Sequence, residues 1–424
     1  MPRHLRPNWP HVDDPRRWCA GVVLSGTCNR LEAVLVTATG QGLDLRLETA
    51  GSKTIQGCAE IASMFGQLSA AGQASSPSIA ALRAQLADAQ AGLVNELLAE
   101  TGVAPNRVLA IGTQDPGLWH GQATGAGGYL GLCDGARLAE STGLNVIDAF
   151  ADRDLALGGQ GGPVTAVAQW LLLRAPNRNR VLLDLGRTVR MSYLPAAREP
   201  NAQARILAFD VGPGMRLLDL LTHRLTGGQH RFDPGGRLAV QGRQIGDLVD
   251  HWLADPYFER PLPRWHPHGV RPERFLTDSL QMAVQWRWSI RDLLCSATHF
   301  IAETVSQAVR RRLPDDANIE QIVLTGGGQH NGMLLREIGS RLPGMPLTRI
   351  GELGIDGGSL EAAAVAVLAL MFLDQIPANP TGVTGAAPPR VLGRITPGSP
   401  QNWQRLMHEL TGVRPVIRPL RSAI

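Results

Sequence analysis

Short apolar segments separated by polar and glycine-containing turns fill the first part of the chain. Residues 19–25, 33–39 and 43–49 each have the length and composition of a strand. Because the turns between them are short, these segments predict an antiparallel meander. A serine-rich stretch at residues 69–78 is predicted to be a linker.

A helix follows, and then strands and helices alternate. Apolar residues recur at helical spacing between Ser78, the predicted N-cap, and Gly102, the predicted stop. Further strands are predicted at residues 107–111, 145–148, 180–185, 206–210 and 321–325. Further helices are predicted at residues 134–142, 164–173, 215–225, 239–254, 277–312, 330–342 and 358–373, and the chain past residue 377 is predicted to be rich in loops. This alternation predicts an α/β fold.

The composition fits two or three domains, or one large two-lobed enzyme. The chain has 424 residues, of which 44% are hydrophobic and 18% are charged, so a full core can form. The net charge of +4 is carried almost wholly by arginine, since Lys53 is the only lysine. Without an interleaved basic and aromatic stripe, we expect no nucleic-acid partner. Lys53 follows serine rather than glycine, which excludes a P-loop, so a phosphate site must use backbone amides, arginines or a metal ion.

The cysteines and the N-terminus predict a cytoplasmic protein. The five cysteines form no Cys-x-x-Cys pair and no zinc spacing, which favours reduced thiols. The first ten residues lack the apolar segment of a signal peptide. No run of about 18 apolar residues predicts a membrane span, so no membrane partner is expected.

One carboxylate precedes a glycine-rich turn in the middle of the chain. Asp154 lies four residues before Gly158-Gly-Gln-Gly161, and Pro163 opens the apolar run that follows. Glycines let a ligand approach the backbone, and a helix N-terminus attracts anions. A carboxylate beside such a turn could act as a general base next to a bound phosphate or sugar. Taken alone, the segment is more typical of a tight surface turn with a solvated aspartate.

Three further turns at strand ends favour a nucleotide site. Asp184-Leu-Gly186 and Asp210-Val-Gly212 each end a predicted strand, and Gly326-Gly-Gly328 follows another. Ligands of α/β sheets bind at the carboxyl ends of strands, where an aspartate can hold Mg²⁺ or its waters. Together, the turns predict a two-lobed nucleotide-binding fold in which hairpins clamp the phosphates and a glycine turn passes under the adenine.

With these motifs in this order, the chain resembles the anhydro-N-acetylmuramic acid kinases, a family of the sugar kinase, heat-shock protein 70 and actin superfamily. The resemblance runs from about residue 22 to about residue 403. The segments that carry it are residues 138–143, 154–163, 208–214, 255–258, 326–331, 353–356 with Glu361, 379–386 and 391–393. It implies an α/β, two-lobed actin-like ATPase (ribonuclease H-like) fold with a central cleft. We expect residues 1–145 and 377–424 in the first lobe and residues 146–376 in the second.

The resemblance also implies a reaction and its cofactors. The family uses ATP, and by resemblance Mg²⁺, to convert 1,6-anhydro-N-acetylmuramic acid, a product of peptidoglycan recycling, into N-acetylmuramic acid 6-phosphate. Water attacks the anomeric carbon, the anhydro bond opens, and the freed O6 takes the γ-phosphate. The resemblance implies that Asp154 is the base that activates this water. The family also tends to form homodimers.

The resemblance assigns the ligand-facing turns residue by residue. Nucleotide and phosphate contacts are expected at Ser25, Gly26, Thr27, Asp184, Gly186, Asp210, Gly212, Gly214, Gly326, Gly327 and Gly328. Sugar contacts are expected at His120, Gly158, Gly159, Gln160 and Gly161. The metal ligands are not identified.

Several of these turns depart from the family's pattern. Arg30 stands where the first phosphate turn carries an aspartate, and Glu32 is the nearest acidic substitute. The family's His-Gly-Gln-Thr-x-x-His sugar motif reads as residues 114–120, of which only His120 is kept. Arg187 replaces a glycine of the second phosphate hairpin. An arginine cannot ligate a metal, but it can hold a phosphate in bidentate fashion.

Two hypotheses therefore stand side by side. The retained glycine turns, Asp154 and Asp210 favour an active sugar kinase in which both aspartates face the cleft between the lobes. The altered motifs favour a catalytically inactive homologue that acts as a sugar- or nucleotide-binding or regulatory module.

Overall fold

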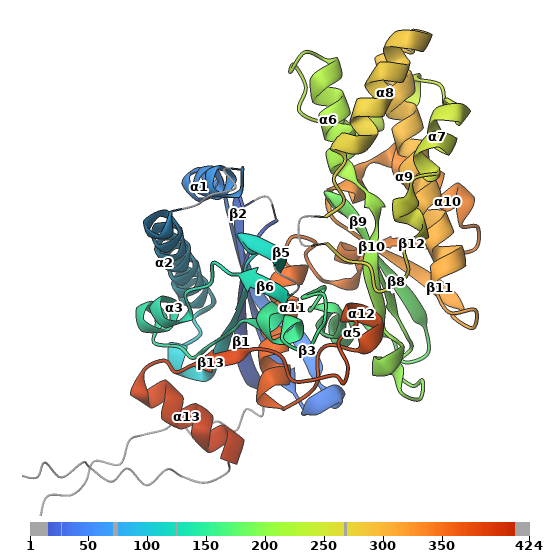
Figure 1. Cartoon of the computed structure of the whole chain (residues 1–424). Coiled ribbons are helices and arrows are strands. Elements are labelled where there is room, and N and C mark those ends of the chain that lie inside the picture. Colours follow the sequence, from blue (N-terminus) through green and yellow to red (C-terminus); the bar gives the residue numbers. More distant parts are fainter. Residues whose placement is uncertain (1–15, 27, 71–74, 124–125, 267–268, 412–424) are drawn as a thin grey trace, which may run out of the picture.

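Two α/β bodies lie side by side in the structure (Figure 1). The structure is a computed structural model, and it describes residues 16–26, 28–70, 75–123, 126–266 and 269–411. One body contains a six-stranded sheet and the other a five-stranded sheet. A third, two-stranded sheet is the hairpin of β5 (Trp119–Ala123) and β6 (Ala126–Leu130).

The first sheet begins with the predicted antiparallel meander, which is confirmed. In order across the sheet, its strands are β13 (Arg394–Thr396), β7 (Val146–Asp148), β4 (Val108–Gln114), β1 (Arg17–Leu24), β2 (Arg30–Thr39) and β3 (Arg46–Gln56). β1 pairs with β2, and β2 with β3, in antiparallel register, whereas β4 runs parallel to β1. The late strand β13 brings the end of the chain back to this sheet through β7.

Helices cover both faces of the first sheet, so its central strands are buried along their whole length. α2 (Ser76–Thr101) packs on one face, and the almost wholly apolar α11 (Leu360–Leu373) packs on the other. Gly21 of β1 and Gly112 of β4 lie under α11, where a Cβ atom would overlap the helix backbone. These two glycines therefore let α11 rest directly on the sheet.

The second sheet has helices packed along one side (Figure 1). In order, its strands are β10 (Leu207–Pro213), β9 (Thr188–Leu194), β8 (Asn179–Leu185), β11 (Ile319–Thr325) and β12 (Leu347–Arg349). The helices of this lobe are α6 (Met215–Leu225), α7 (Gly246–Leu253), α8 (Glu273–Trp286), α9 (Ile290–Arg312) and α10 (Gly332–Arg341). They share one buried apolar cluster with the sheet, in which Phe300 of α9 packs against Trp252 and Phe275.

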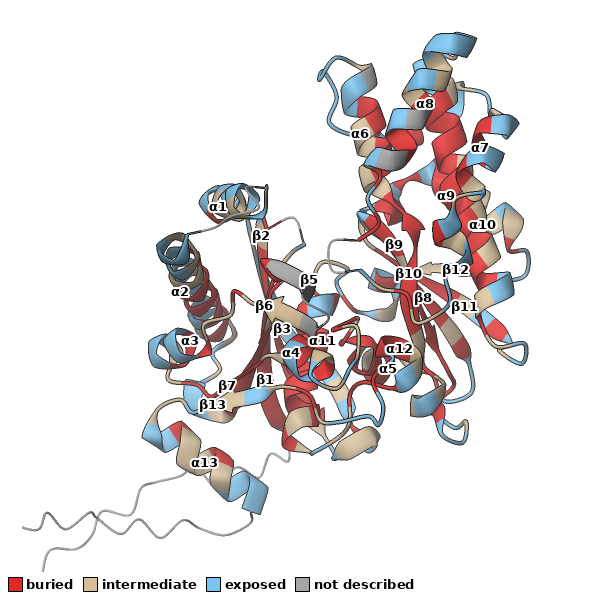
Figure 2. Cartoon of the chain, viewed as in Figure 1, coloured by how far each residue is buried: buried red, intermediate tan, exposed pale blue. Residues whose placement is uncertain are grey.

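One apolar core joins the two lobes. α5 (Ala166–Leu173) and α11 lie between the sheets, and their buried side chains share a cluster with β1 and β2 of the first sheet and with β8 and β11 of the second. Figure 2 shows this central region as mostly buried. The first turns of both helices therefore lie close to each sheet at once. The remaining helices are α1 (Ala59–Ala70), α3 (Gly135–Thr142), α4 (Phe150–Leu155), α12 (Thr381–Thr384) and α13 (Pro400–Thr411).

The predicted helix over residues 277–312 is two helices in the structure. Ser289 forms a capping box with Asp292, which starts α9, and Arg287 ends α8 with a φ of 55°. The long helix α2 is likewise capped by Ser75, whose hydroxyl accepts a hydrogen bond from the backbone N–H of Ser78. Local capping chemistry, and not the apolar period, sets these boundaries.

Other elements differ from the sequence expectation. α1 occupies residues that precede and overlap the predicted linker, and β9 is a strand that was not predicted. The tail past residue 377 contains α12, β13 and α13. The expected lobe boundaries stay a prediction. Any division of the chain into lobes has to take account of the packing of α11 on the first sheet. Among the described residues, no helix combines the length and apolarity needed to cross a bilayer.

Candidate functional site

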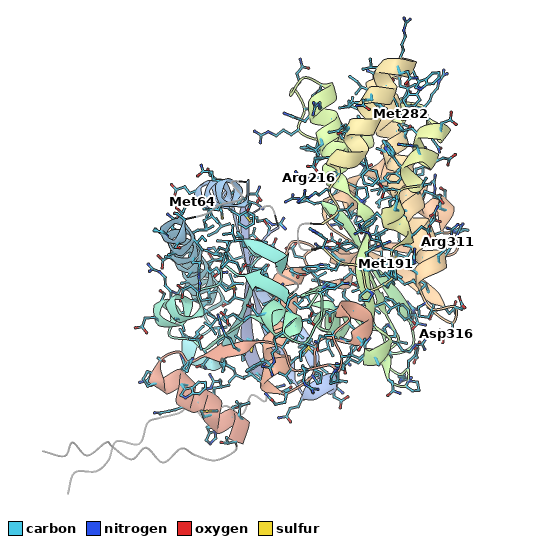
Figure 3. All side chains as sticks on the ribbon, viewed as in Figure 1. Met64, Met191, Arg216, Met282, Arg311 and Asp316 are labelled. Atoms are coloured by element: carbon cyan, nitrogen blue, oxygen red, sulfur yellow. The ribbon has the colours of Figure 1, made fainter. Side chains whose placement is uncertain are left out.

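A cavity of about 320 Å³ lies between the two lobes. Its wall is built from strand ends and turns of both sheets and from the first turns of the two central helices. The lining residues that bear on chemistry are Ser25, Gly26, Arg30, Glu32, Asp115, Gly161, Thr165, Gln169, Asp184, Arg190, Gly326 and Glu361. Met191, labelled in Figure 3 within the second sheet, lies in the same wall. The cavity therefore gathers carboxylates, arginines and glycine turns from segments far apart in sequence.

The turn after β1 contributes Ser25 and Gly26 to this cavity, whereas Thr27 lies outside the described residues. Arg30, at the start of β2, forms an ion pair with Glu32. Burial raises the pKa of Glu32 to about 7, against the opposing effect of Arg30. Glu32 does lie at the cavity, as a substitute for the missing aspartate would, but its carboxylate is already engaged by the arginine.

The β8–β9 hairpin brings Asp184 to the opposite wall. Burial raises the pKa of Asp184 to about 6. Gly186 and Gly326 border this carboxylate closely, and a Cβ atom at Gly326, where φ is +78°, would overlap it. Asp184 accepts no hydrogen bond from any residue that the structure describes. It is therefore a carboxylate at a glycine turn with its oxygens available to a ligand.

The glycine turns of the second lobe are held against this hairpin. The backbone N–H of Gly214 donates to the carbonyl of Arg187, and that of Met215 donates to the carbonyl of Gly186, at 3.0 and 2.8 Å. A Cβ atom at Gly328 would overlap Leu185. The structure thus brings together the predicted turns at Asp184, at Gly212 to Gly214 and at Gly326 to Gly328.

Asp210 does not reach the cavity. It is fully buried, and its Oδ1 accepts a hydrogen bond from Nε of Arg190 at 3.0 Å, while Oδ2 accepts one from the backbone N–H of His266 at 2.9 Å. Burial raises the pKa of Asp210, and Arg190 opposes the rise. Arg190 itself lines the cavity. The expectation that Asp210 faces the cleft is therefore wrong, because an arginine takes that place.

Asp154 does not face the cleft either. It lies in α4 and is fully buried, outside the cavity wall. Its Oδ1 accepts hydrogen bonds from Nδ2 of Asn379 at 2.8 Å and Oγ1 of Thr384 at 2.7 Å, and its Oδ2 accepts one from the backbone N–H of Gly161 at 2.8 Å. All three donors belong to the protein itself, so both carboxylate oxygens are engaged by the fold. The expectation that Asp154 faces the cleft is wrong, because its carboxylate ties the glycine turn to the C-terminal segment, whereas its role as the base stays a prediction.

The glycine turn itself reaches the cavity only at its end. Gly161 lines the cavity, whereas Gln160 bridges to the loop before Trp265. Its Nε2 donates to the carbonyl of Pro263 at 2.8 Å, and its Oε1 accepts from the backbone N–H of Trp265 at 3.0 Å. A Cβ atom at Gly159 would overlap Asp154. Sugar contacts from Gly158, Gly159 and Gln160 stay a prediction that this arrangement does not favour.

The altered sugar motif folds into an internal turn. Asp115 accepts hydrogen bonds from the backbone N–H groups of Gly117, Leu132 and Cys133 and from the hydroxyl of Tyr129. With these donors its carboxylate is saturated. His120 lies in β5, and its side chain is outside the described part of the chain.

Glu361 is a cavity carboxylate that the residue patterns alone did not single out. It lies in the first turn of α11, and its side chain is accessible in the cleft. Its oxygens accept hydrogen bonds from Oγ1 of Thr165 at 3.0 Å and Nε2 of Gln169 at 3.2 Å. Its pKa is raised, chiefly by desolvation. The usable sequence signal was a lone carboxylate at the start of an otherwise apolar helix.

The described residues contain no group of three or more histidine, cysteine, aspartate or glutamate side chains placed to hold a metal ion. Asp184 nevertheless offers hard oxygen ligands at a glycine turn. One carboxylate is sufficient for Mg²⁺ when substrate phosphates supply further ligands. Asp184 therefore fits a nucleotide-bound Mg²⁺, and it does not fit a metal held by protein alone.

The chain is similar to known proteins along most of its length. A model of the family described as anhydro-N-acetylmuramic acid kinase matches residues 20–398. The anhydro-N-acetylmuramic acid kinase of Crocosphaera subtropica is 29% identical over 382 residues, covering 89% of this chain and 98% of that protein. The one of Nitrosomonas europaea is 31% identical over 376 residues, covering 88% and 98%. The match to the family spans both sheets and the cavity between them.

Solved structures with a similar arrangement have low sequence identity. The activator of the 2-hydroxyisocaproyl-CoA dehydratase from Clostridium difficile, with bound ADPNP, is 13% identical with a TM-score of 0.41, covering 83% of this chain and 94% of that one. A ROK hexokinase from Thermus thermophilus is 15% identical with a TM-score of 0.37, covering 83% and 99%.

Proposed function

Because the chain belongs to the anhydro-N-acetylmuramic acid kinase family and has a two-lobed actin-like ATPase fold, we propose that it uses ATP to open and phosphorylate 1,6-anhydro-N-acetylmuramic acid in this cleft. The family membership and the fold class were both predicted from the sequence and are confirmed. The observation that carries the proposal is the pair of cavity carboxylates, Asp184 at the glycine turns and Glu361 at the start of α11.

In this proposal, Glu361 takes the part first given to Asp154. Glu361 is accessible in the cleft and held by two neutral donors, and its raised pKa makes it a stronger proton acceptor than an ordinary glutamate. Water gives its proton to Glu361 and bonds to the anomeric carbon, and the bond from that carbon to O6 breaks. O6 then attacks the γ-phosphate, and ADP leaves. Asp154 becomes a positioning residue that fixes Gly161 at the cavity wall.

Asp184 would hold the Mg²⁺ that the family implies. Bound there with the nucleotide, the ion would neutralise charge on the transferred phosphoryl group. Burial raises the pKa of Asp184 to about 6, so its carboxylate is ionised at neutral pH and ready to bind a cation. Gly327, in the glycine turn beside it, faces open space, which leaves room for phosphate oxygens.

A second candidate function is a binding or regulatory module without turnover. Its support is the pairing of two acidic groups with arginines, Glu32 with Arg30 and Asp210 with Arg190. Those pairs remove negative charge that could otherwise serve a metal or a proton transfer. In this case ATP or the sugar would still bind, but the anhydro bond would stay intact.

One assay separates the two candidates. The purified full chain is incubated with ATP, Mg²⁺ and 1,6-anhydro-N-acetylmuramic acid, and the sugar 6-phosphate and ADP are measured by mass spectrometry. Equimolar formation of both supports the kinase. Binding of ATP and sugar by calorimetry without product would overturn the kinase and support the module, and absence of binding would overturn both. The expected homodimer is a separate prediction, which sedimentation analysis tests.

A further inference from the structure

Arg187 reaches from one lobe to the other across the cleft. It occupies the turn between β8 and β9, and its Nη1 donates a hydrogen bond to the carbonyl oxygen of Gly26 at 2.9 Å. Gly26 belongs to the turn after β1 in the first lobe. The side chain therefore links the two turns that are expected to hold the phosphates of a nucleotide.

The backbone of Arg187 is fixed before any ligand arrives. Its carbonyl accepts a hydrogen bond from the N–H of Gly214, and the neighbouring Gly186 carbonyl accepts one from Met215. These bonds anchor the hairpin turn to the start of α6. The guanidinium thus lies against Gly26, which lines the cavity, and a ligand need only compete for this one side-chain hydrogen bond.

The charge of Arg187 has no acidic partner in the part of the chain that the structure describes. Among the described residues no carboxylate lies within ion-pair distance of it, and one of its five N–H groups is used on a neutral carbonyl. Burial and the nearby cation of Arg216, labelled in Figure 3 at the start of α6, lower the pKa of Arg187. Across the cavity, Nε of Arg30 is buried without a hydrogen-bond acceptor. Arg187 and Arg30 therefore both keep N–H groups that no described acceptor uses.

We propose that Arg187 binds the terminal phosphates of ATP, exchanging the Gly26 carbonyl for phosphate oxygens. The proposal rests on the proposed function, which places ATP in this cleft. A guanidinium can bind phosphate through two parallel N–H groups, and Gly26 and Gly327 face open space in which phosphate oxygens can lie. The guanidinium supplies its positive charge to the phosphates whether or not a divalent cation is bound. ATP therefore binds this chain without Mg²⁺, although phosphoryl transfer still uses the ion.

The test is calorimetric titration of ATP and of adenosine into four full-length proteins, in EDTA and in Mg²⁺. The proteins are the wild type, Arg187→Ala, Arg187→Lys and the control Arg198→Ala, which removes an exposed arginine that follows the opposite end of β9 and donates a hydrogen bond to Asn177. We expect wild type to bind ATP in EDTA within about tenfold of its affinity in Mg²⁺. In EDTA, Arg187→Ala should weaken ATP binding roughly 10- to 100-fold, the loss typical of one hydrogen bond to a charged group.

The remaining comparisons show whether the effect is on phosphate. Adenosine affinity should change less than about twofold in Arg187→Ala, Arg187→Lys should recover part of the ATP affinity, and Arg198→Ala should match wild type. Wild-type affinity for ATP in Arg187→Ala, an equal loss for adenosine, or binding only in Mg²⁺ would each overturn the inference and leave the proposed kinase standing. A wild type that binds ATP in neither condition would overturn the proposed function too.

Discussion

Arg190 and Asp210 face each other directly on the antiparallel strands β9 and β10, with Nε of the arginine 3.0 Å from Oδ1 of the aspartate. The aspartate is fully buried, whereas about 38% of the arginine side chain is exposed to the cavity. The pair thus places a cation on the cavity wall and hides the carboxylate that the sequence motif places at a strand end.

Removing the cation alone should destabilise the protein. Arg190→Met leaves a buried carboxylate without its partner, and we expect the free energy of unfolding in urea to fall by about 3 kcal/mol. The double variant Arg190→Met with Asp210→Asn should recover at least about 1 kcal/mol of that loss. Additive losses in this double-mutant cycle would show that the two side chains do not interact.

Asp154 should matter for stability more than for chemistry. Asp154→Ala removes three hydrogen bonds to buried groups, and we expect a loss of about 2–4 kcal/mol in the free energy of unfolding. At temperatures where the variant is folded, kcat should stay within about tenfold of wild type. A variant with wild-type stability and no turnover would instead restore Asp154 as the base.

Glu361 should matter for chemistry more than for stability. Glu361→Gln keeps the size of the side chain and one accepting oxygen for Thr165 or Gln169, but it cannot accept a proton, so we expect kcat to fall about 10²- to 10⁴-fold. ATP affinity should change less than about threefold. The matched control is Glu320→Gln, an exposed glutamate of β11, which should keep the wild-type rate. Full activity in Glu361→Gln would remove Glu361 from the mechanism.

Glu32 should make stability depend on pH. Burial raises its pKa from 4.5 to about 7, against the opposing charge of Arg30 and with smaller contributions from Glu361 and Asp356. The folded state therefore holds a proton that the unfolded state has lost, and stability falls as pH rises through this window. Relative to Glu32→Gln, the wild type should lose up to about 3 kcal/mol between pH 4.5 and pH 7, measured by urea unfolding across that range. A constant difference between the two proteins would contradict the raised pKa.

The sequence was informative where a signal is local. The meander of β1 to β3 and the apolar helix α11 follow from runs of apolar residues, and the family follows from motifs in a fixed order. The break between α8 and α9 was missed because the apolar period continues across it, although Ser289 and Asp292 form a recognisable capping box.

The site was harder to predict because its geometry depends on distant contacts. Asp154 accepts hydrogen bonds from Asn379 and Thr384, which are more than 220 residues away in sequence, and no local pattern reveals that pairing. Asp210 is hidden by Arg190, which a sequence motif cannot orient. Glu361 reaches the cavity because α11 crosses between the lobes. In each case tertiary packing decided which carboxylate meets the cavity.

The close packing of α11 on Gly21 and Gly112 fixes this helix to the first sheet, so it moves with that sheet if the cleft opens. Glu361 is carried by a helix whose backbone lies directly against the first sheet, while Asp184 ends a strand of the second. A rotation of one lobe relative to the other therefore changes the separation of these two carboxylates without bending either element. The distance between Glu361 and Asp184 is thus a direct gauge of lobe closure, and a pair of spectroscopic labels at exposed sites on the two sheets would read it during turnover.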